Sequence, residues 1–310
     1  MIQTVLGPIR PDAFGFALPH EHVLCDFIGA AATGPHRWDA DEVFRTMLPY
    51  LRQARDRGVT GFVDCTPAYI GRDVRLLQRL ARETGLHILT NTGYYGAAKD
   101  KYLPTHALTE TSDALAARWI REWEKGIDGT DVRPGFLKIG VDPAEGTPPR
   151  LSEVDARIVR AAARASKRTG LSVASHTGQG AAALAQLAIF AEEGVPASRF
   201  IYVHADGEKD ADARRQVAVK GAWVEFDAVG SRPADEHLKQ VLPLVDAYPD
   251  RVLLSMDRGW YNAGEPNGGK IRDYNALHDA FLPALRAAGV REATIRKLTV
   301  ENPAKAFTKG

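Results

Sequence analysis

The chain has 310 residues, 45% of them hydrophobic and 25% charged, which is the balance of a globular protein with a sizeable core. Forty Lys and Arg stand against 39 Asp and Glu, and a net charge of +1 gives no field that would collect nucleic acid or an anionic membrane. No run approaches the roughly 20 apolar residues of a membrane span, and no basic segment with an apolar run opens the chain. We therefore expect a cytoplasmic protein without nucleic-acid or membrane partners, with Cys25 and Cys65 as thiols.

Apolar runs typical of strands alternate with amphipathic runs typical of helices, and no linker rich in Pro, Gly or Ser interrupts them. The predicted strands cover residues 16–25, 59–65, 87–92, 136–139, 171–176, 199–204, 222–227 and 251–257. Helices are predicted over residues 41–57, 72–84, 152–170, 180–193, 274–288 and 291–298, with a further helix capped by Ser112 and another ending at Gly221.

Eight strands that alternate with helices are the count of a closed (β/α)8 TIM barrel rather than an open doubly wound sheet. No glycine-rich dinucleotide or phosphate-binding fingerprint follows any strand. We therefore expect an α/β fold with one barrel domain over residues 1–310.

The first predicted strand carries two histidines separated by one residue. Side chains two residues apart on an extended backbone share a face, so His20 and His22 can hold one metal ion while Glu21 points the opposite way. An isolated pair of this kind is more often two ordinary strand histidines than a metal site. Whether the pair binds a metal therefore depends on which residues stand at the ends of the other strands.

In a (β/α)8 barrel the active site lies at the carboxyl ends of the strands. His176 ends the fifth predicted strand, His204 the sixth and Asp257 the eighth. The remaining five histidines lie at a strand start, on loops or on helices and are assigned structural roles: His36, His87, His106, His237 and His278.

Lys138 ends the fourth predicted strand, and a bare ammonium beside histidines in a barrel mouth is costly. Three interpretations stay open from the residues alone. Lys138 clamps a substrate phosphate, or it forms a Schiff base as in aldolases built on this barrel, or its amine has captured carbon dioxide. In the third case the carbamate is an anionic ligand between two cations, and four histidines and Asp257 complete the inventory for two divalent metals that hold a hydroxide.

Several motifs occur in a specific order and spacing: Leu18-Pro19-His20-Glu21-His22-Val23, Gly71-Arg72-Asp73, Thr92-Gly93-Tyr94-Tyr95, Gly126-Ile127-Asp128-Gly129-Thr130, Phe136-Leu137-Lys138, Ser175-His176-Thr177, His204-Ala205-Asp206, Phe226-Asp227, Asp257 and Glu301-Asn302-Pro303-Ala304. With these motifs the chain resembles the phosphotriesterase family of the amidohydrolase superfamily over essentially its full length.

This resemblance implies a barrel of the amidohydrolase type and a binuclear metal centre. His20, His22 and Asp257 would bind the more buried metal, and His176 and His204 the more exposed one. N6-carboxylated Lys138 would bridge the two divalent ions, for which zinc is expected, with cobalt, manganese and iron as alternatives. The resemblance also suggests a homodimer.

Two cations that share one water can lower its pKa to about neutrality and so supply a hydroxide nucleophile. Asp257 is the candidate catalytic proton carrier to the leaving alkoxide, beside its role as a ligand. The imidazoles need acceptors that fix their tautomers, and the sequence offers Asp64, Asp206 or Asp227 for this purpose.

Members of the family cleave organophosphate triesters, lactones, phosphorylated sugar lactones and simple carboxylic esters. Lactonase branches that hydrolyse quorum signals usually carry an arginine after the strand-seven aspartate and tend to carry a histidine before the last metal ligand, where this chain has Ala228 and Met256. The first departure counts against a long-chain acyl-homoserine lactone.

We therefore expect a lactonase or carboxylic ester hydrolase that acts on a small molecule, with promiscuous organophosphate triesterase activity. The alternatives are a phosphotriesterase as such, a sugar-phosphate lactonase, more distantly a Schiff-base aldolase that uses Lys138, and a non-catalytic binding protein.

The loop after the eighth strand is glycine-rich and carries several cations. Arg258, Lys270 or Arg272 could grip a phosphate or carboxylate on the substrate, or the loop is simply a solvated surface. Tyr94 and Tyr95 are expected in the pocket wall, and Tyr261 is a further candidate for substrate binding. Trp119 and Trp123, at helical spacing, are expected to pack in the core.

Overall fold

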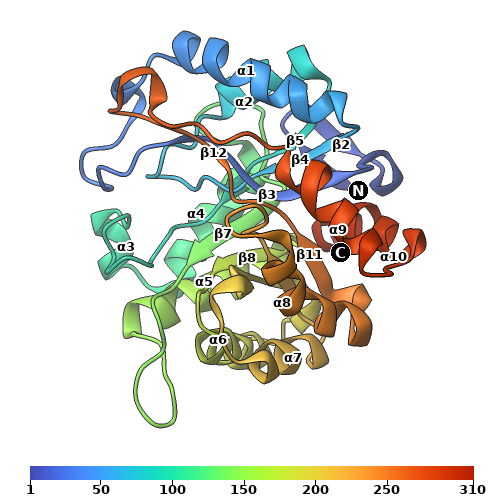
Figure 1. Cartoon of the computed structure of the whole chain (residues 1–310). Helices are drawn as coiled ribbons and strands as arrows, with labels where there is room; N and C mark the ends of the chain where they lie inside the picture. The colour runs from blue at the N-terminus through green and yellow to red at the C-terminus, as the bar shows by residue number, and fades with distance from the viewer.

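The computed structural model describes residues 1–310, and its strands form a parallel barrel enclosed by helices (Figure 1). Six strands, β6 to β11, pair in sequence order, and β3, β4 and β5 pair in the same way. The barrel strands are β3 (Ala17–Cys25), β4 (Gly61–Asp64), β5 (His87–Leu89), β6 (Asn91–Thr92), β7 (Phe136–Gly140), β8 (Val173–His176), β9 (Phe200–Val203), β10 (Trp223–Phe226) and β11 (Val252–Leu254).

Two junctions join these runs into a ring of eight. At the first, β5 and β6 are parts of one strand that is interrupted at Thr90. At the second, the backbone N–H of Asp257, just beyond β11, donates to the carbonyl oxygen of His20 in β3 at 3.1 Å. A short strand, β12 (Gly259–Asn262), then pairs in parallel with β3. The predicted (β/α)8 barrel is therefore the fold.

The helices begin and end largely where the sequence signals place them. Asp39, Asp73 and Ser152 accept backbone N–H groups at the starts of α1, α2 and α5. The helices are α1 (Ala40–Asp56), α2 (Val74–Thr84), α3 (Thr105–Thr109), α4 (Ser112–Lys125), α5 (Glu153–Thr169), α6 (Gly180–Glu192), α7 (Ala211–Val219), α8 (Ala234–Ala247), α9 (Leu282–Ala287), α10 (Glu292–Arg296) and α11 (Asn302–Phe307).

The predicted cap of α4 was wrong by one residue. The hydroxyl of Thr111 accepts the backbone N–H of Ala114 at 3.2 Å, whereas the Ser112 hydroxyl donates to the carbonyl oxygen of Arg157. The hairpin of β1 (Ile2–Thr4) and β2 (Gly7–Ile9) was not predicted, and neither were α3, α8 and β12.

Two π-helical turns lie near the C-terminus: Leu277–Phe281 is inside the predicted helix 274–288, and Lys297–Glu301 extends the predicted helix 291–298 beyond its expected end. In both, a proline stands two residues after the turn, Pro283 or Pro303. Proline lacks an N–H and its ring pushes against the preceding turn, which accounts for the wider hydrogen-bonding pattern just before it.

Two buried clusters form the core. The smaller fills the barrel interior with side chains such as Val63, Ile201 and Leu253 and is closed by Phe307 of α11. The larger lies between strands and helices; Trp119 is buried in it and Trp123 packs against it, as predicted. Cys25 and Cys65 are free buried thiols. No helix is long and apolar enough to cross a bilayer.

Candidate metal centre

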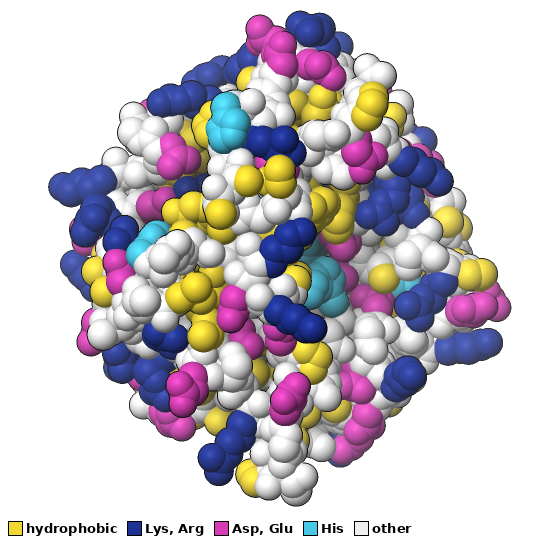
Figure 2. All heavy atoms as spheres, turned by 90° about the vertical axis from the view of Figure 1, so that its left-hand side faces the viewer, with side chains coloured by type: hydrophobic (Ala, Val, Ile, Leu, Met, Phe, Trp, Pro, Cys, Tyr) yellow, Lys and Arg dark blue, Asp and Glu magenta, His cyan; other side chains and the backbone are white.

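All six predicted metal ligands line one pocket of about 200 Å³ at the carboxyl ends of the strands. Figure 2 looks at one face of the molecule, where histidine side chains lie in a hollow near the middle. The ligands come from β3, β7 and β8 and from the residues that follow β9 and β11: His20, His22, Lys138, His176, His204 and Asp257.

The first half of the pocket is built from β3 and the segment after β11. The Nε2 atom of His22 lies 3.1 Å from Oδ1 of Asp257, and that of His20 lies 3.8 Å from the same oxygen. This Oδ1 is buried and has no hydrogen-bond partner. A buried carboxylate oxygen left between two imidazole nitrogens is costly without a cation, so these residues fit a divalent metal.

The second half is built from β8 and β9. The rings of His176 and His204 lie 4.3 Å apart, and the ring of His204 lies 5.0 Å from that of His20. Burial, together with the positive charges of His204 and Lys138, lowers the pKa of His176 well below its usual range. A neutral imidazole keeps the lone pair that a metal requires.

Asp227 connects the two halves. Its Oδ1 lies 2.8 Å from Nδ1 of His204, and its Oδ2 lies 3.2 Å from Nδ1 of His20. Of the three aspartates considered from the sequence, Asp227 is thus the one that contacts ligand imidazoles through their outer nitrogens. The carboxylate of Asp64 instead accepts the backbone N–H of Val23, and that of Asp206 accepts the backbone N–H of Asp227.

A buried glutamate and a threonine complete this network, and sequence reasoning gave them no role in it. Oε2 of Glu225 lies 3.2 Å from Nδ1 of His20, and the Thr66 hydroxyl lies 2.8 Å from Nδ1 of His22. Burial, reinforced by the charge of Asp227, raises the pKa of Glu225 well above its usual range. A usable signal existed, because Glu225 and Asp227 are two residues apart on one strand, as His20 and His22 are.

Glu21 points away from the histidines, as predicted, and holds the chain around Asp257. Its Oε1 accepts the Ser255 hydroxyl at 2.8 Å and the backbone N–H of Met256 at 3.1 Å, while Oε2 accepts the backbone N–H of Arg258 at 2.8 Å. These bonds lie on both sides of Asp257, whose φ of 50° is in the left-handed region. Glu21 therefore stabilises the unusual backbone that aims Asp257 at the histidines.

The side chain of Lys138 is buried in the pocket floor. Its Nζ makes no hydrogen bond and no ion pair within 4.0 Å, and it lies 5.9 Å from the centre of the Tyr95 ring. Burying a lysine without a carboxylate partner is unfavourable, so Lys138 fits a place where a bound ligand or a chemical modification offsets that cost.

Above the ligands the pocket is lined by apolar and aromatic side chains. Four rings, here named the aromatic wall, contact one another in sequence: Tyr95 lies 5.7 Å from Tyr102, Tyr102 6.3 Å from Phe27, and Phe27 5.2 Å from Trp260. The Trp260 ring lies 5.1 Å from the ring of His22. The wall, most of which the sequence did not reveal, contributes no charged group to the pocket.

Among the sequence candidates for substrate binding, Tyr95 lines the pocket and the others do not. Tyr94 faces the opposite way and its hydroxyl lies 3.1 Å from Nε2 of His106, because neighbouring residues on an extended backbone point to opposite sides. The Tyr261 hydroxyl donates to Glu42, 2.6 Å away.

The three cations of the eighth loop also lie outside the pocket lining. Arg258 donates to the carbonyl oxygen of Gly230 at 2.5 Å and lies 3.7 Å from the Asp273 carboxylate. Arg272 is exposed and stacks on Trp260, with its guanidinium carbon 5.0 Å from the ring centre, and Lys270 is exposed. The histidines assigned structural roles are absent from this pocket too: His36, His87, His106, His237 and His278.

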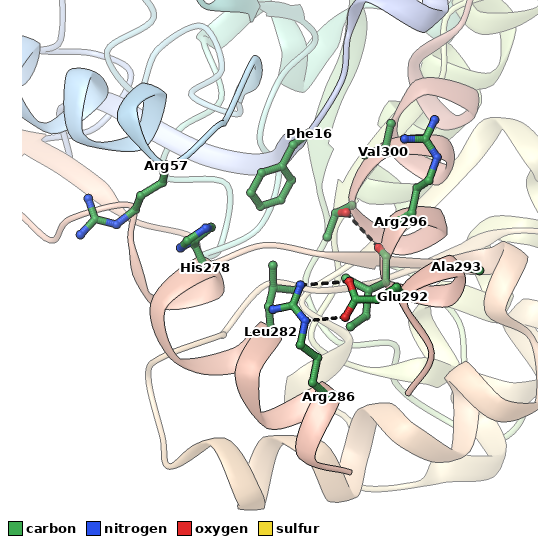
Figure 3. A pocket seen from close by; sticks show the side chains of 11 residues that line it. Phe16, Arg57, His278, Leu282, Arg286, Glu292, Ala293, Arg296 and Val300 are labelled. Atoms are coloured by element: carbon green, nitrogen blue, oxygen red, sulfur yellow. Dashed lines mark hydrogen bonds and ion pairs between the residues drawn. The ribbon is translucent and has the colours of Figure 1, made fainter. Parts of the chain in front are cut away.

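A second, larger hollow of about 500 Å³ lies elsewhere on the molecule (Figure 3). Phe16, which directly precedes β3, lines it together with Leu282 and His278, so this hollow is at the amino end of that strand. Arg286 and Glu292 form an ion pair at its edge, 2.5 Å apart. Active sites of this fold lie at the other end of the barrel.

Comparison with known proteins agrees with this geometry. A model of the phosphotriesterase family matches residues 1–307. The phosphotriesterase homology protein of Escherichia coli is 31% identical over 96% of this chain and 99% of that protein. The aryldialkylphosphatase of Saccharolobus solfataricus is 29% identical over 97% of each chain, and the N-acetyltaurine hydrolase of Xenopus tropicalis is 25% identical over 99% of this chain and 97% of that protein. The chain therefore belongs to the phosphotriesterase family and is a metal-dependent hydrolase that acts on ester bonds.

Proposed function

We propose that the chain is a lactonase or carboxylic ester hydrolase for compact, uncharged substrates, with organophosphate triesters cleaved in a slower side reaction. The observation that carries this proposal is the lining of the pocket. Above the metal ligands it is apolar and aromatic, and Lys138 is the only lysine or arginine in it. A volume of about 200 Å³ favours a short acyl or ring substituent over a long one.

The proposed centre holds two divalent ions, with zinc expected and cobalt, manganese or iron as alternatives. His20, His22 and Asp257 would hold one ion, His176 and His204 the other, and N6-carboxylated Lys138 would bridge them. The lack of any acidic partner for the buried Lys138 amine supports the carbamate. Bound there, the two ions would supply a hydroxide nucleophile near neutral pH and a Lewis acid for the substrate oxygen.

The protein's own groups have separate tasks in this proposal. Asp257, through its unpartnered Oδ1, takes the proton from the nucleophile and helps deliver it to the leaving alkoxide. Asp227 and Thr66 fix the ring orientations of His20, His204 and His22 through the nitrogens that face away from the pocket. The aromatic wall excludes water and holds the apolar part of the ester.

The alternatives differ in what they ask of the pocket. Phosphotriesterase as the main activity is supported by the relative named aryldialkylphosphatase. A sugar-phosphate lactonase needs a cation for the phosphate, and Arg258, Lys270 and Arg272 do not line the pocket. A Schiff-base aldolase would explain Lys138 but leave four histidines and Asp257 without a role. The relative named N-acetyltaurine hydrolase adds amides to the compounds worth testing.

The deciding experiment pairs metal content per chain, by elemental analysis, with initial rates on short and long lactones, aryl esters, a phosphorylated lactone, an N-acyl amide and paraoxon. We expect about two metals per chain, loss of activity on chelation, and kcat/KM on short lactones or aryl esters at least roughly tenfold above the other compounds. Failure to bind metal after reconstitution with bicarbonate and zinc, cobalt or manganese would overturn the proposal. Borohydride trapping with a keto substrate would then support the aldolase.

The proposal also includes one catalytic domain over residues 1–310, a homodimer and a cytoplasmic location. The family match over residues 1–307 supports the single domain. Sedimentation velocity at micromolar concentration tests the dimer, and a single species with the 33.8 kDa mass of one chain would contradict it.

A further inference from the structure

The segment between Tyr95 and Tyr102 forms part of the pocket rim in an unusual backbone conformation. Ala98, Lys99 and Asp100 have φ values of 62°, 57° and 60°, so three consecutive residues other than glycine are left-handed. L-residues rarely adopt this region even singly, because Cβ crowds the following carbonyl oxygen. Ala98 lines the metal pocket, and something outside the segment must therefore stabilise the turn beside it.

The carboxylate of Asp142 provides this stabilisation. Its Oδ1 accepts the backbone N–H of Ala98 and its Oδ2 accepts that of Lys99, each at 2.9 Å. Both oxygens are thus occupied by the first two amides of the left-handed turn. Asp142 lies two residues beyond β7, and the carbonyl oxygen of Gly140 at the end of β7 accepts the backbone N–H of Gly96 at 2.9 Å. The turn is fixed to the strand that also carries Lys138.

Hydrogen bonds link the same turn to the aromatic wall. Its carbonyl oxygen at Asp100 accepts the backbone N–H of Leu103, which sets the chain direction at Tyr102. The next residue, Lys101, accepts the backbone N–H of Ala30 at 3.1 Å, and its Nζ donates to the carbonyl oxygen of Phe27 at 2.7 Å. Tyr95, Tyr102 and Phe27, three of the four rings of the wall, are therefore tied to the turn that Asp142 holds.

We infer that Asp142 is a specificity-determining positioning residue. Its carboxylate keeps residues 98–100 in the left-handed turn, which closes the pocket beside the metal ligands and limits the length of the acyl or alkyl group that enters. The inference rests on the proposed function for the class of substrate. Asp142 does not line the pocket itself, so it acts through the turn.

The first test is Asp142→Asn, which turns one of the two acceptors into a donor with almost no change of volume. We expect kcat/KM for an octanoyl aryl ester to rise roughly tenfold relative to the acetyl ester, with kcat for the acetyl ester within about threefold of wild type. The metal content should remain that of wild type. A general loss of activity with both esters would contradict the inference.

A second variant separates specificity from damage. Glycine adopts left-handed φ without cost, so Lys99→Gly and Asp100→Gly, added together to Asp142→Asn, should retain the turn without the carboxylate. We expect this triple variant to return the octanoyl to acetyl ratio toward wild type. The glycines alone, at two positions outside the pocket lining, should leave the ratio unchanged. If the glycines do not restore the ratio, the turn is not the means by which Asp142 acts.

Two further readouts do not require turnover. Hydrogen exchange should show the amides of Ala98 and Lys99 protected in wild type and unprotected in Asp142→Asn. Calorimetric titration with n-alkyl hydroxamates, from acetohydroxamate to octanohydroxamate, measures the chain-length limit by binding alone. If wild type hydrolyses none of the esters, the proposed function fails while the hydroxamate series still decides the inference. Equal chain-length dependence in wild type and Asp142→Asn would overturn it.

Discussion

The two cavities described above differ in a way that size does not capture. The hollow around Phe16 and Leu282 holds about 500 Å³, and the metal pocket about 200 Å³. Charged side chains that line the larger hollow have partners: Arg57 pairs with Asp279 at 2.8 Å. Arg286 pairs with Glu292 (Figure 3).

In the metal pocket two polar atoms are left without a hydrogen-bond partner in the protein. Oδ1 of Asp257 has no hydrogen bond, and Nζ of Lys138 has no ion pair. Folding has placed these groups away from water at a free-energy cost that only a bound cation or a reaction would recover. Buried polar groups without partners that converge on one point therefore indicate the reactive cavity. The larger cavity has no such groups among the charged pairs at its edge.

The strongest test of this contrast is Asp257→Asn. The amide cannot accept a proton in the reaction and is a poor metal ligand, so kcat/KM should fall roughly 10³-fold or more. In the metal-free protein this carboxylate lies 3.1 Å from Nε2 of His22 in a partly exposed pocket, so the substitution should change the urea midpoint of unfolding only slightly. A large drop in the urea midpoint would instead mean that Asp257 is needed for folding.

The meeting of the six proposed ligands in one place could be predicted because two simple rules apply to them. His20 and His22 share a face by the two-residue period of a strand, and His176, His204 and Asp257 end strands of a parallel barrel, where side chains from distant sequence positions meet. The structure brings all of them, with Lys138, into one pocket. Neither rule requires knowledge of loop conformation.

The pocket wall could not be predicted, because it depends on loop dihedral angles. After β11, Asp257 and Trp260 both have left-handed φ, 50° and 69°. These turns send Trp260 into the pocket, whereas Arg258 and Tyr261, which the sequence suggested for substrate binding, face Gly230 and Glu42. The left-handed turn at Ala98 is equally invisible in a sequence that has no glycine there.

Supporting residues lay between these extremes. The chemical role of Lys138 could be suggested from its residue type and its place at a strand end. The partners of the imidazoles depend instead on distances that only the structure gives. Asp227 reaches His20 and His204, whereas Asp206 lies against His237 on α8, 2.6 Å from its Nε2. The two-residue spacing of Glu225 and Asp227 was a hint of this difference, but only the distances establish it.

A smaller effect is expected from Glu21→Gln, which alters the support of the metal pocket and none of its lining. The glutamine side chain has one acceptor oxygen where glutamate has two. The segment around Asp257 therefore loses at least one of the three hydrogen bonds that it donates to Glu21. Loss of such support typically costs about 10- to 100-fold in metal affinity or activity. Competition with a chelating dye should show that one of the two metal ions binds more weakly than in wild type. Excess metal should restore part of kcat.

Ser255→Ala is the comparison for this variant, since it leaves the carboxylate in place and removes the hydroxyl that donates to Glu21 and accepts the backbone N–H of His20 at 2.9 Å. Its loss of metal affinity should be smaller than that of Glu21→Gln. Equal metal affinity in wild type and both variants would mean that the backbone around Asp257 holds its shape without Glu21.

The smallest effect on turnover is expected at the large hollow. Leu282 is 5% exposed and lines it, and Leu282→Ala removes buried apolar surface far from any metal ligand. We expect the free energy of unfolding, from urea denaturation, to fall by about 2 kcal/mol, the low end for such truncations because water can enter the open side. In the metal-loaded protein kcat and KM should match wild type at 25 °C. If kcat fell while metal content and folding stayed intact, the two ends of the barrel would be coupled, and the larger cavity would have to be counted as part of the catalytic apparatus.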